Sequence, residues 1–417
     1  MKTELHSSNV KKRHLPIFEW ALPVFCILQY YTYGFLSVGL IMIYVLTALC
    51  FYADSKWYIY KPIVYFLIYI LFNNLIKMLF IQEVSSEYYN TILEKIASFL
   101  VLVAVSSRIN ENQLYKSWTI VAAPVLAGMV FQSFMAYGLQ KPVSPISILP
   151  ISSEMARQWT ISSLRPSSLF SEPSAFVWFM LPLLFLAIKR GKYVFAIIIN
   201  LAMFLSTSTT GILLSLLLWL AFSVFMPRSR KEKILSIILV IAFVLLLAFL
   251  SVFSFSKEKL ITTDIGDSFR LGYGFKILST MPKNQWLFGV PYSSVASYIT
   301  DSGNVPASWY DIRIPYFSFV NAFCQNFIQY GLIGTILYLN LFFALYRGGD
   351  KEIRPLLLVD FLSIWGESVS FGSGLFIVQF AVLIALDKRK GFSKNYIVLH
   401  KEGWSNENCY SYDPLCQ

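Results

Sequence analysis

The sequence predicts an all-α polytopic membrane protein with about twelve transmembrane helices. Of its 417 residues, 56% are hydrophobic and only 14% are charged, and the mean hydropathy is +0.60. Much of the apolar content lies in runs of about 18 residues or more, the length that crosses a bilayer. This composition is typical of an integral membrane protein, and we expect the whole chain, 1–417, to form a single membrane domain.

Twelve apolar segments account for these runs, with boundaries uncertain by about two to four residues. The polar head, 1–14, and the long apolar stretch that follows do not fit a cleaved signal peptide, so the first span is expected to be a retained anchor. In chain order the expected spans lie near 16–33, 35–53, 62–81, 91–107, 117–137, 174–188, 193–207, 210–226, 234–254, 325–346, 353–368 and 371–386.

Basic residues divide the connections between these spans into two groups. The short connections at 33–34, 82–90, 207–210 and 369–371 contain no Lys or Arg, whereas the head, the tail and the alternate connections are basic. The positive-inside rule therefore places both termini in the cytoplasm. The net charge of +11 is mostly this topology signal and an attraction to anionic lipid headgroups, and it does not indicate a nucleic-acid partner.

Two outer connections are much longer than the others, 138–173 and 255–321. Long loops on a rigid scaffold are where function usually resides. The tail, 387–417, is expected to be a short cytoplasmic extension. The five cysteines show neither metal-ligand spacing nor a disulfide framework, so no metal or cofactor is expected.

The first long loop ends in Ser-Ser-Leu-Arg-Pro-Ser-Ser-Leu-Phe-Ser-Glu-Pro-Ser, residues 162–174, directly before an apolar run. Pro173 suits the first helical turn, because the amide that it lacks would be unpaired there. Glu172 and Ser171 are candidates to cap the positive helix end. A capped helix start and a functional site are both compatible with this pattern.

The second long loop carries an arginine-centred segment with helical spacing, from Arg270 to Thr280, which Pro282 ends. Its glycines follow no strand, so they are not a phosphate-binding fingerprint. Asn321, Gln325 and Gln329 then recur every four residues as a polar stripe that enters the next span. Such a stripe more often bonds neighbouring helices than a ligand.

Four segments, in this order, resemble the O-antigen and capsular repeat-unit polymerases, relatives of the O-antigen ligases. They are Arg-Pro-Ser-Ser-Leu-Phe-Ser-Glu-Pro-Ser (165–174), Ser-Thr-Ser-Thr-Thr-Gly-Ile (206–212), Trp-Leu-Phe-Gly-Val (286–290) and Tyr-Gly-Leu-Ile-Gly (330–334), within residues 155–345. The resemblance implies a GT-C-like glycosyltransferase of the bacterial inner (cytoplasmic) membrane. It would move a glycan from undecaprenyl diphosphate to a hydroxyl of another lipid-linked repeat unit for lipopolysaccharide or capsule, with a chain-length regulator as a candidate partner.

This chemistry requires cations and a base in the outer loops. Breaking a glycosyl-diphosphate bond places negative charge on the leaving group, which arginines accept through paired hydrogen bonds, while a carboxylate activates the attacking hydroxyl. No cofactor is needed, because the donor is already activated. The expected catalytic residues are Glu172, Arg165 and Arg270, and the expected substrate-binding residues are Arg157, Arg313, Asn321 and Gln325.

Two other functions remain open. Asp360 is a charged residue within a predicted span, which would suit a proton-coupled transporter or flippase of twelve spans. It could equally form an ion pair with Lys77. The two halves of the chain show no visible repeat and differ in loop length, which disfavours that class. A ligase acting on lipid A-core is the closer rival. Relatives of that type commonly have an outer histidine, whereas His6, His14 and His400 all fall on the predicted cytoplasmic side.

Overall fold

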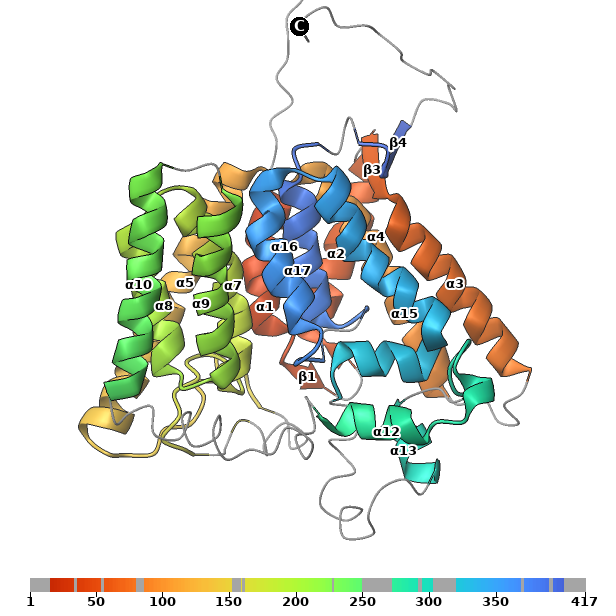
Figure 1. The fold of residues 1–417 in the computed structure, drawn as a ribbon, viewed down its shortest axis with the longest axis horizontal. Coiled ribbons are helices and arrows are strands. Elements are labelled where there is room, and N and C mark those ends of the chain that lie inside the picture. Colours follow the sequence, from red (N-terminus) through yellow and green to blue (C-terminus); the bar gives the residue numbers. More distant parts are fainter. Residues whose placement is uncertain are drawn as a thin grey trace, which may run out of the picture.

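The computed structural model describes residues 16–33, 36–53, 56–79, 86–151, 159, 162–226, 229–249, 272–291, 295–302, 320–368, 371–389 and 393–400. Apart from two short two-stranded sheets, these residues form helices, turns and loops (Figure 1). The longer helices are α1 (Ile17–Leu28), α2 (Val38–Ala53), α3 (Lys61–Met78), α4 (Ser86–Arg108), α5 (Glu111–Ser133), α7 (Pro173–Lys189), α8 (Tyr193–Leu205), α9 (Thr209–Phe225), α10 (Arg230–Phe249), α15 (Ala322–Gly348), α16 (Arg354–Ser363) and α17 (Gly374–Leu386). The shorter helical elements are η1 (Phe134–Gly138), α12 (Gly274–Thr280), η5 (Lys283–Gln285), α13 (Val295–Ser302) and η7 (Lys351–Ile353), and the strands are β1 (Thr32–Tyr33), β2 (Leu36–Ser37), β3 (Lys56–Tyr60) and β4 (Tyr396–His400).

The helices α7 and α17 form the core of the bundle. Every side chain of α7 from 175 to 188 is buried, as is every side chain of α17 from 376 to 386. A helix that is apolar all round is stable only where other helices enclose it. Accordingly, α5, α8 and α9 pack against α7, and α4 packs along α17 (Figure 1). The Gln379 side chain joins the two core helices by donating a hydrogen bond to the Trp178 carbonyl, at 3.1 Å.

Each of the expected spans contains a helix, which confirms the prediction of a mostly helical fold. Among the described residues, three helical segments are long and apolar enough to cross a membrane: α3, the continuous stretch Glu111–Gly138, and α15. The helices α4 and α10 are also long, with 23 and 20 residues, and the remaining helices are shorter. With 10 and 13 residues, α16 and α17 extend about 15 and 20 Å, less than the ~30 Å hydrocarbon layer. The number of twelve crossings therefore stays a prediction.

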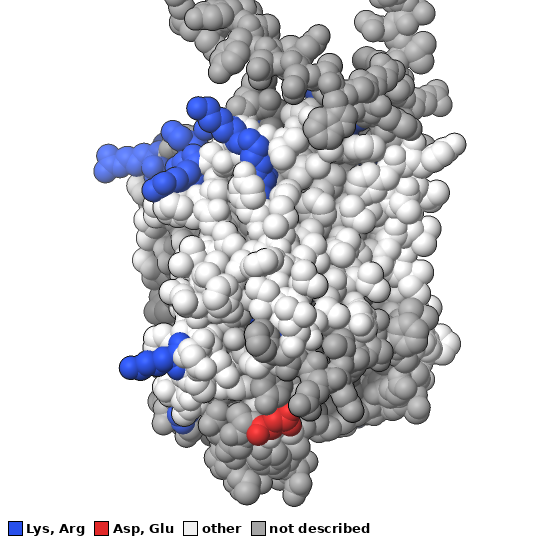
Figure 2. Space-filling model, turned by 90° about the vertical axis from the view of Figure 1, so that its right-hand side faces the viewer, with Lys and Arg blue, Asp and Glu red and all other residues white. Residues whose placement is uncertain are grey.

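The outward face of α3 is apolar. Its exposed side chains include Tyr65, Ile68, Phe72 and Leu75, which recur at helical spacing. Figure 2 views the molecule from this side and shows an uncharged belt between a group of Lys and Arg at the upper end and a few charged residues at the lower end. Exposed apolar surface of this extent is unusual in a monomer surrounded by water. The belt fits contact with lipid.

The helix α15 is broken at Gly331, where the sequence predicted one continuous span, 325–346. Gly331 has φ 68° and ψ −169°, a conformation that is essentially restricted to glycine. The segment 286–290 pairs with the broken backbone, since the Val290 amide donates to the Ile328 carbonyl at 2.8 Å and the Leu332 amide to the Trp286 carbonyl at 2.7 Å. The first part of α15 consequently runs across the lower end of the bundle (Figure 1).

The predicted tail, 387–417, begins with an ordered strand rather than a simple extension. Strand β4 pairs antiparallel with β3, from Lys56 opposite His400 to Tyr60 opposite Tyr396. Strands this short, far apart in the sequence, give no local signal, so the sequence predicted helices alone. The pairing joins the tail to the basic connection that precedes α3, which agrees with placing both on one side of the membrane.

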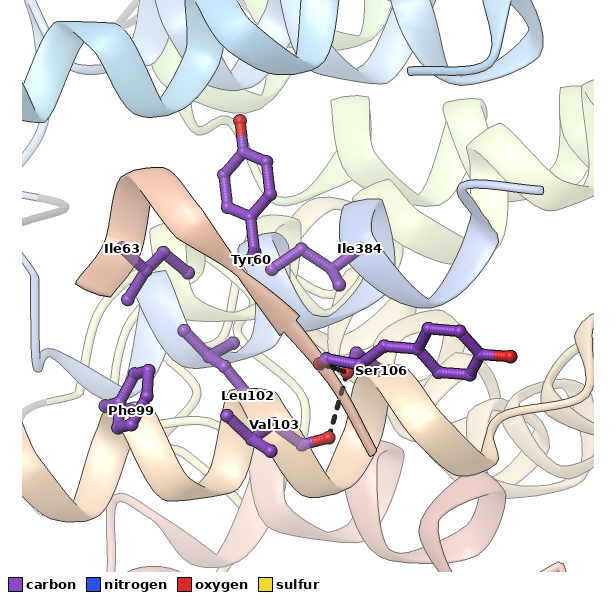
Figure 3. A pocket seen from close by; sticks show the side chains of 8 residues that line it. Tyr60, Ile63, Phe99, Leu102, Val103, Ser106 and Ile384 are labelled. Carbon is purple, nitrogen blue, oxygen red and sulfur yellow. Dashed lines mark hydrogen bonds between the residues drawn. The ribbon is translucent and has the colours of Figure 1, made fainter. Parts of the chain in front are cut away.

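A small crevice lies beside β3. It lies between β3, α3, α4 and α17, and Tyr60, Leu102 and Ile384 are among its mostly apolar lining (Figure 3). Its volume is about 10 Å³, room for at most one water. The crevice is therefore a packing defect and not a ligand site.

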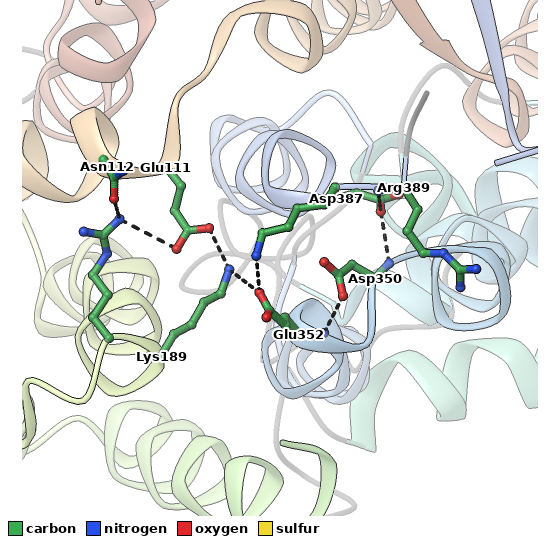
Figure 4. Close-up of polar contacts among 9 residues, drawn as sticks. Glu111, Asn112, Lys189, Asp350, Glu352, Asp387 and Arg389 are labelled. Atoms are coloured by element: carbon green, nitrogen blue, oxygen red, sulfur yellow. Dashed lines mark hydrogen bonds and ion pairs between the residues drawn. The ribbon is translucent and has the colours of Figure 1, made fainter. Parts of the chain in front are cut away.

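Charged residues join the helix ends at the same end of the bundle as β3 and β4 (Figures 1 and 4). The Lys189 ammonium lies 2.7 Å from the Glu111 carboxylate and 3.2 Å from that of Glu352, and Lys388 lies 2.7 Å from Glu352. Hydrogen bonding to Lys388 and Lys189 lowers the pKa of Glu352. This network, which we call the 111/189/352/388 cluster, ties together the ends of α5, α7, η7 and α17.

Candidate functional site

Arg165 lies in the loop that precedes α7 and reaches across to the turn between α8 and α9. Its Nε and one terminal nitrogen donate to the hydroxyl and the carbonyl of Thr207, at 3.4 and 3.5 Å. Thr207 is 3% exposed and has a φ of 51°, a left-handed backbone conformation that non-glycine residues rarely adopt. Such strained positions concentrate at functional sites. The two motifs 165–174 and 206–212 thus meet at this contact.

Hydrogen bonds from α5 hold the loop that carries Arg165. The Gln132 amide oxygen accepts from the backbone amides of Ser167 and Ser168, at 2.9 and 2.7 Å. The Ser168 hydroxyl donates to the Val125 carbonyl at 2.6 Å. Both serines are buried, and their backbone amides and the Ser168 hydroxyl are hydrogen-bonded. The two serines shape the loop, so the charged residues of the motif 165–174 are its candidates for a chemical role.

Glu172 precedes the first residue of α7, as predicted, and Pro173 opens the helix. The expected side-chain cap is wrong, however, because the Glu172 carboxylate accepts no hydrogen bond from the helix backbone. Its Oε1 instead accepts from the Ser174 hydroxyl at 2.6 Å. The carboxylate therefore contacts the first turn of α7 through this hydroxyl and not through the backbone amides.

Electrostatics link Glu172 to Arg165. Burial lowers the pKa of the Arg165 guanidinium, and the nearby Tyr137 and Glu172 oppose that change. The arginine remains charged, since its ordinary pKa is above about 12. A cation that is partly buried beside a carboxylate can accept further negative charge from a ligand with little competition from water.

Glu367 is a site residue that sequence reasoning missed. It follows α16, is 6% exposed, and its Oε1 accepts a hydrogen bond from the Thr210 hydroxyl. Its carbonyl accepts from the amide of Ala322, the first residue of α15, at 2.8 Å. In the sequence Glu367 was only a charge near the end of a span. Its contact with the 206–212 motif depends on the fold and left no local signal.

Tyr30, two residues after the end of α1, is influenced by both carboxylates. Both Glu172 and Glu367 act electrostatically on its hydroxyl. These interactions link Arg165, the two carboxylates and the hydroxyls of Thr207 and Thr210, which come from segments far apart in the sequence and which we call the Arg165 cluster. This combination can neutralise an anionic leaving group and take a proton from an attacking hydroxyl.

The other predicted site residues have separate positions. Asn321 is buried and its side chain caps α15 by accepting from the Cys324 amide at 2.9 Å. The Gln325 amide oxygen is buried and has no hydrogen-bond partner among the described residues. Arg157, Arg270 and Arg313 lie outside the described residues.

Within the described part of the chain, Lys77 and Asp360 do not form the ion pair that was one of the two alternatives from the sequence. The Lys77 ammonium donates to the Gln329 carbonyl and lies 5.6 Å from the centre of the Tyr330 ring. It therefore sits at the negative end of the first part of α15, at the break. Asp360 is 4% exposed, and neither of its carboxylate oxygens has a partner within the described part of the chain.

Within the described ranges, no three His, Cys, Asp or Glu side chains come together as a metal site would require. No protein-family model and no curated protein matches the chain. The resemblance to repeat-unit polymerases consequently rests on the ordered motifs and on the residues that they bring together.

Proposed function

We propose that the protein is a membrane glycosyltransferase that polymerises lipid-linked oligosaccharide repeat units on the outer face of the bacterial cytoplasmic membrane. The observation that supports this most strongly is the contact of Arg165 with the strained Thr207, beside Glu172 and Glu367. The sequence motifs suggest the same reaction, and the fold joins two of them in one cluster.

In the proposed reaction, a hydroxyl of one lipid-linked unit attacks the anomeric carbon of the glycan carried by undecaprenyl diphosphate. The new C–O bond forms as the bond from that carbon to the diphosphate breaks, and the diphosphate leaves with the electron pair. Arg165 offsets the charge that develops on this leaving group. Glu172 receives the proton of the attacking hydroxyl.

A ligase is the nearest alternative, and the position of the histidines disfavours it. His400 ends β4, opposite Lys56 in the basic connection that precedes α3. His6 and His14 lie outside the described residues. On the predicted topology His400 lies on the cytoplasmic side, whereas a ligase would act on the outer side.

Asp360 is the observation that favours a proton-coupled transporter or flippase, because a buried carboxylate without a partner is a candidate proton carrier. Asp360→Asn separates the two classes. It should leave glycan polymerisation within a few-fold of wild type at normal protein level, since the variant removes only an unpaired charge. Complete loss of function would instead support transport.

The surface glycan of a deletion strain tests the proposal directly. Loss of a polymerase should leave single repeat units on the core, and the plasmid-borne gene should restore the ladder. Loss of a ligase would leave none, and loss of a flippase would strand lipid-linked units inside the cell. Either of the last two patterns would contradict the proposed function.

A further inference from the structure

Lys95 is a buried cation in the first half of α4. It is 7% exposed. No ion pair or hydrogen bond of its ammonium occurs in the described part of the chain, and the charge that acts on it is that of the adjacent Glu94. Consecutive residues of a helix do not face one another, so Glu94 is poorly placed to pair with it.

The Lys95 ammonium lies against the turn that starts α17. Gly372 has a φ of 97°, and a Cβ at this position would come within 2.5 Å of Lys95 Nζ. The next residue, Ser373, caps α17 by accepting a hydrogen bond from the Phe376 amide at 3.2 Å. The backbone amides that precede Phe376 in the first turn of α17 have no acceptor inside the helix. The lysine is therefore placed at the positive end of α17.

Two positive groups thus share one buried position. The aligned peptide dipoles give a helix N-terminus about half a positive charge, and a lysine ammonium adds a full one. Charged side chains within a membrane domain are usually paired or serve a function. Lys95 has no ion-pair partner among the described residues, so this arrangement lacks the anion that would balance it.

We propose that Lys95 and the N-terminus of α17 form a binding site for a phosphate group. Helix N-termini bind phosphate through their amides and dipole, and a lysine adds a point charge. The Lys95 side chain packs directly over Gly372, where a Cβ would meet its Nζ, Cδ and Cε atoms. Gly374, at the start of α17, packs directly against Gln29, and the next residue in the chain is Tyr30, on which Glu172 and Glu367 act. The source of the phosphate rests on the proposed function: we assign it to the diphosphate of the lipid-linked donor.

Thermal unfolding of the purified full chain tests the site without any enzymatic readout. In detergent, inorganic pyrophosphate should raise the melting temperature of the wild type. Lys95→Met should bind pyrophosphate about tenfold or more weakly. Without pyrophosphate this variant should melt no lower than the wild type, because it removes an unpaired buried charge. Lys283→Met, which changes an exposed lysine of η5, should retain the full response.

Two results would overturn the site: a response to pyrophosphate that Lys95→Met retains, or a lower melting temperature of this variant without pyrophosphate. The latter would mean that the lysine stabilises the fold itself. Gly372→Ala is the second variant, and it should also weaken the response, because its Cβ takes the space beside Nζ.

A second arm identifies the source of the phosphate. Phosphatidylcholine nanodiscs that contain undecaprenyl diphosphate should protect the wild type more than Lys95→Met, and nanodiscs without it should not distinguish the two. A response to pyrophosphate alone would contradict the lipid as source. Failure of the proposed function is a separate result, since it appears as an unchanged glycan ladder in the deletion strain.

Discussion

Glu172 and Glu367 differ in what their carboxylates already bind. Glu172 accepts from the Ser174 hydroxyl at the start of α7 and acts on Arg165. Glu367 is buried, and Thr210 donates to it across the bundle. A glutamine keeps an oxygen that can accept the Thr210 hydrogen bond but cannot take a proton at catalytic pH. Replacement by glutamine therefore separates a base from a structural acceptor.

We predict that Glu172→Gln lowers the rate of chain extension by about a hundredfold or more, the typical contribution of a general base. Glu367→Gln should stay within a few-fold of wild type. The measurement is the amount and length of the glycan ladder in the deletion strain, with the membrane level of each variant determined in parallel. A full ladder with Glu172→Gln and none with Glu367→Gln would reverse the two roles.

At the scale of the element, the break in α15 is held by contacts from other parts of the chain. The segment 286–290 supplies backbone partners, and the Tyr69 hydroxyl donates to the Tyr330 carbonyl at 2.7 Å. Lys77 donates to the adjacent carbonyl. Non-helical backbone within a membrane domain is tolerated only where other groups satisfy it in this way. The break is thus a built feature that turns the start of α15 toward Glu367.

Gly331→Ala tests this interpretation, with Gly191→Ala as a matched control. Both glycines have a φ of 68°, but a Cβ at Gly331 would lie 2.3 Å from the Leu287 carbonyl oxygen, whereas nothing lies near one at Gly191. Gly191→Ala should cost about 1–2 kcal/mol from its backbone conformation, and Gly331→Ala should cost clearly more. The check is thermal unfolding of both purified variants. Equal losses of stability would show that the backbone contact at the break is unimportant.

The 111/189/352/388 cluster makes a stability contribution that depends on pH. Hydrogen bonds from Lys388 and Lys189 lower the pKa of Glu352. This contribution is complete above the ordinary glutamate pKa of about 4.3 and is lost as the pH falls through the lowered value of the folded state. Glu352→Gln should therefore be less stable than wild type at neutral pH and equally stable in strong acid.

Because the cluster is partly solvated, the loss at neutral pH should be small, about 1 kcal/mol or less. Lys351→Gln, which changes an exposed neighbour, should follow the wild-type curve throughout. The measurement is the melting temperature of each variant from neutral pH to about pH 3.5. A constant difference between Glu352→Gln and wild type over this range would contradict the assignment.

At the scale of the whole molecule, the charge pattern and the fold agree on which ends of the helices lie together. Reporter fusions after Lys192 and Lys233 should score cytoplasmic, and fusions near Lys141 and Lys283 should score external. The expression level and growth of cells with the untagged protein serve as the reference for detecting misfolded fusions. An external signal at Lys233 would contradict the twelve-span topology.

The helices could be predicted from the sequence because each apolar run is a local signal. Pro173 at the start of α7 was predictable for the same reason, since its effect is confined to one turn. The break at Gly331 was not, because a single glycine in an apolar run becomes a break only through its partners in 286–290.

The residues of the candidate site also differ in whether the sequence alone could identify them. Arg165 and Glu172 lie in one motif, and the sequence identified both. Glu367 and Lys95 acquire their positions from packing between helices that are distant in the chain: one meets Thr210 and the other the turn at Gly372. An isolated acid or lysine near a span end has many explanations in sequence, and only its neighbours in the fold distinguish them.

Chain extension by the purified protein tests the central claim most directly. Lipid-linked repeat units extracted from the deletion strain are incubated with the wild type and with Arg165→Lys in liposomes. We predict a ladder of longer glycans, with one undecaprenyl diphosphate released for each new linkage. Arg165→Lys should extend chains about tenfold more slowly or worse, because lysine loses the paired hydrogen bonds worth about 1.4 kcal/mol. Folded wild type that releases no undecaprenyl diphosphate and makes no ladder would contradict the account.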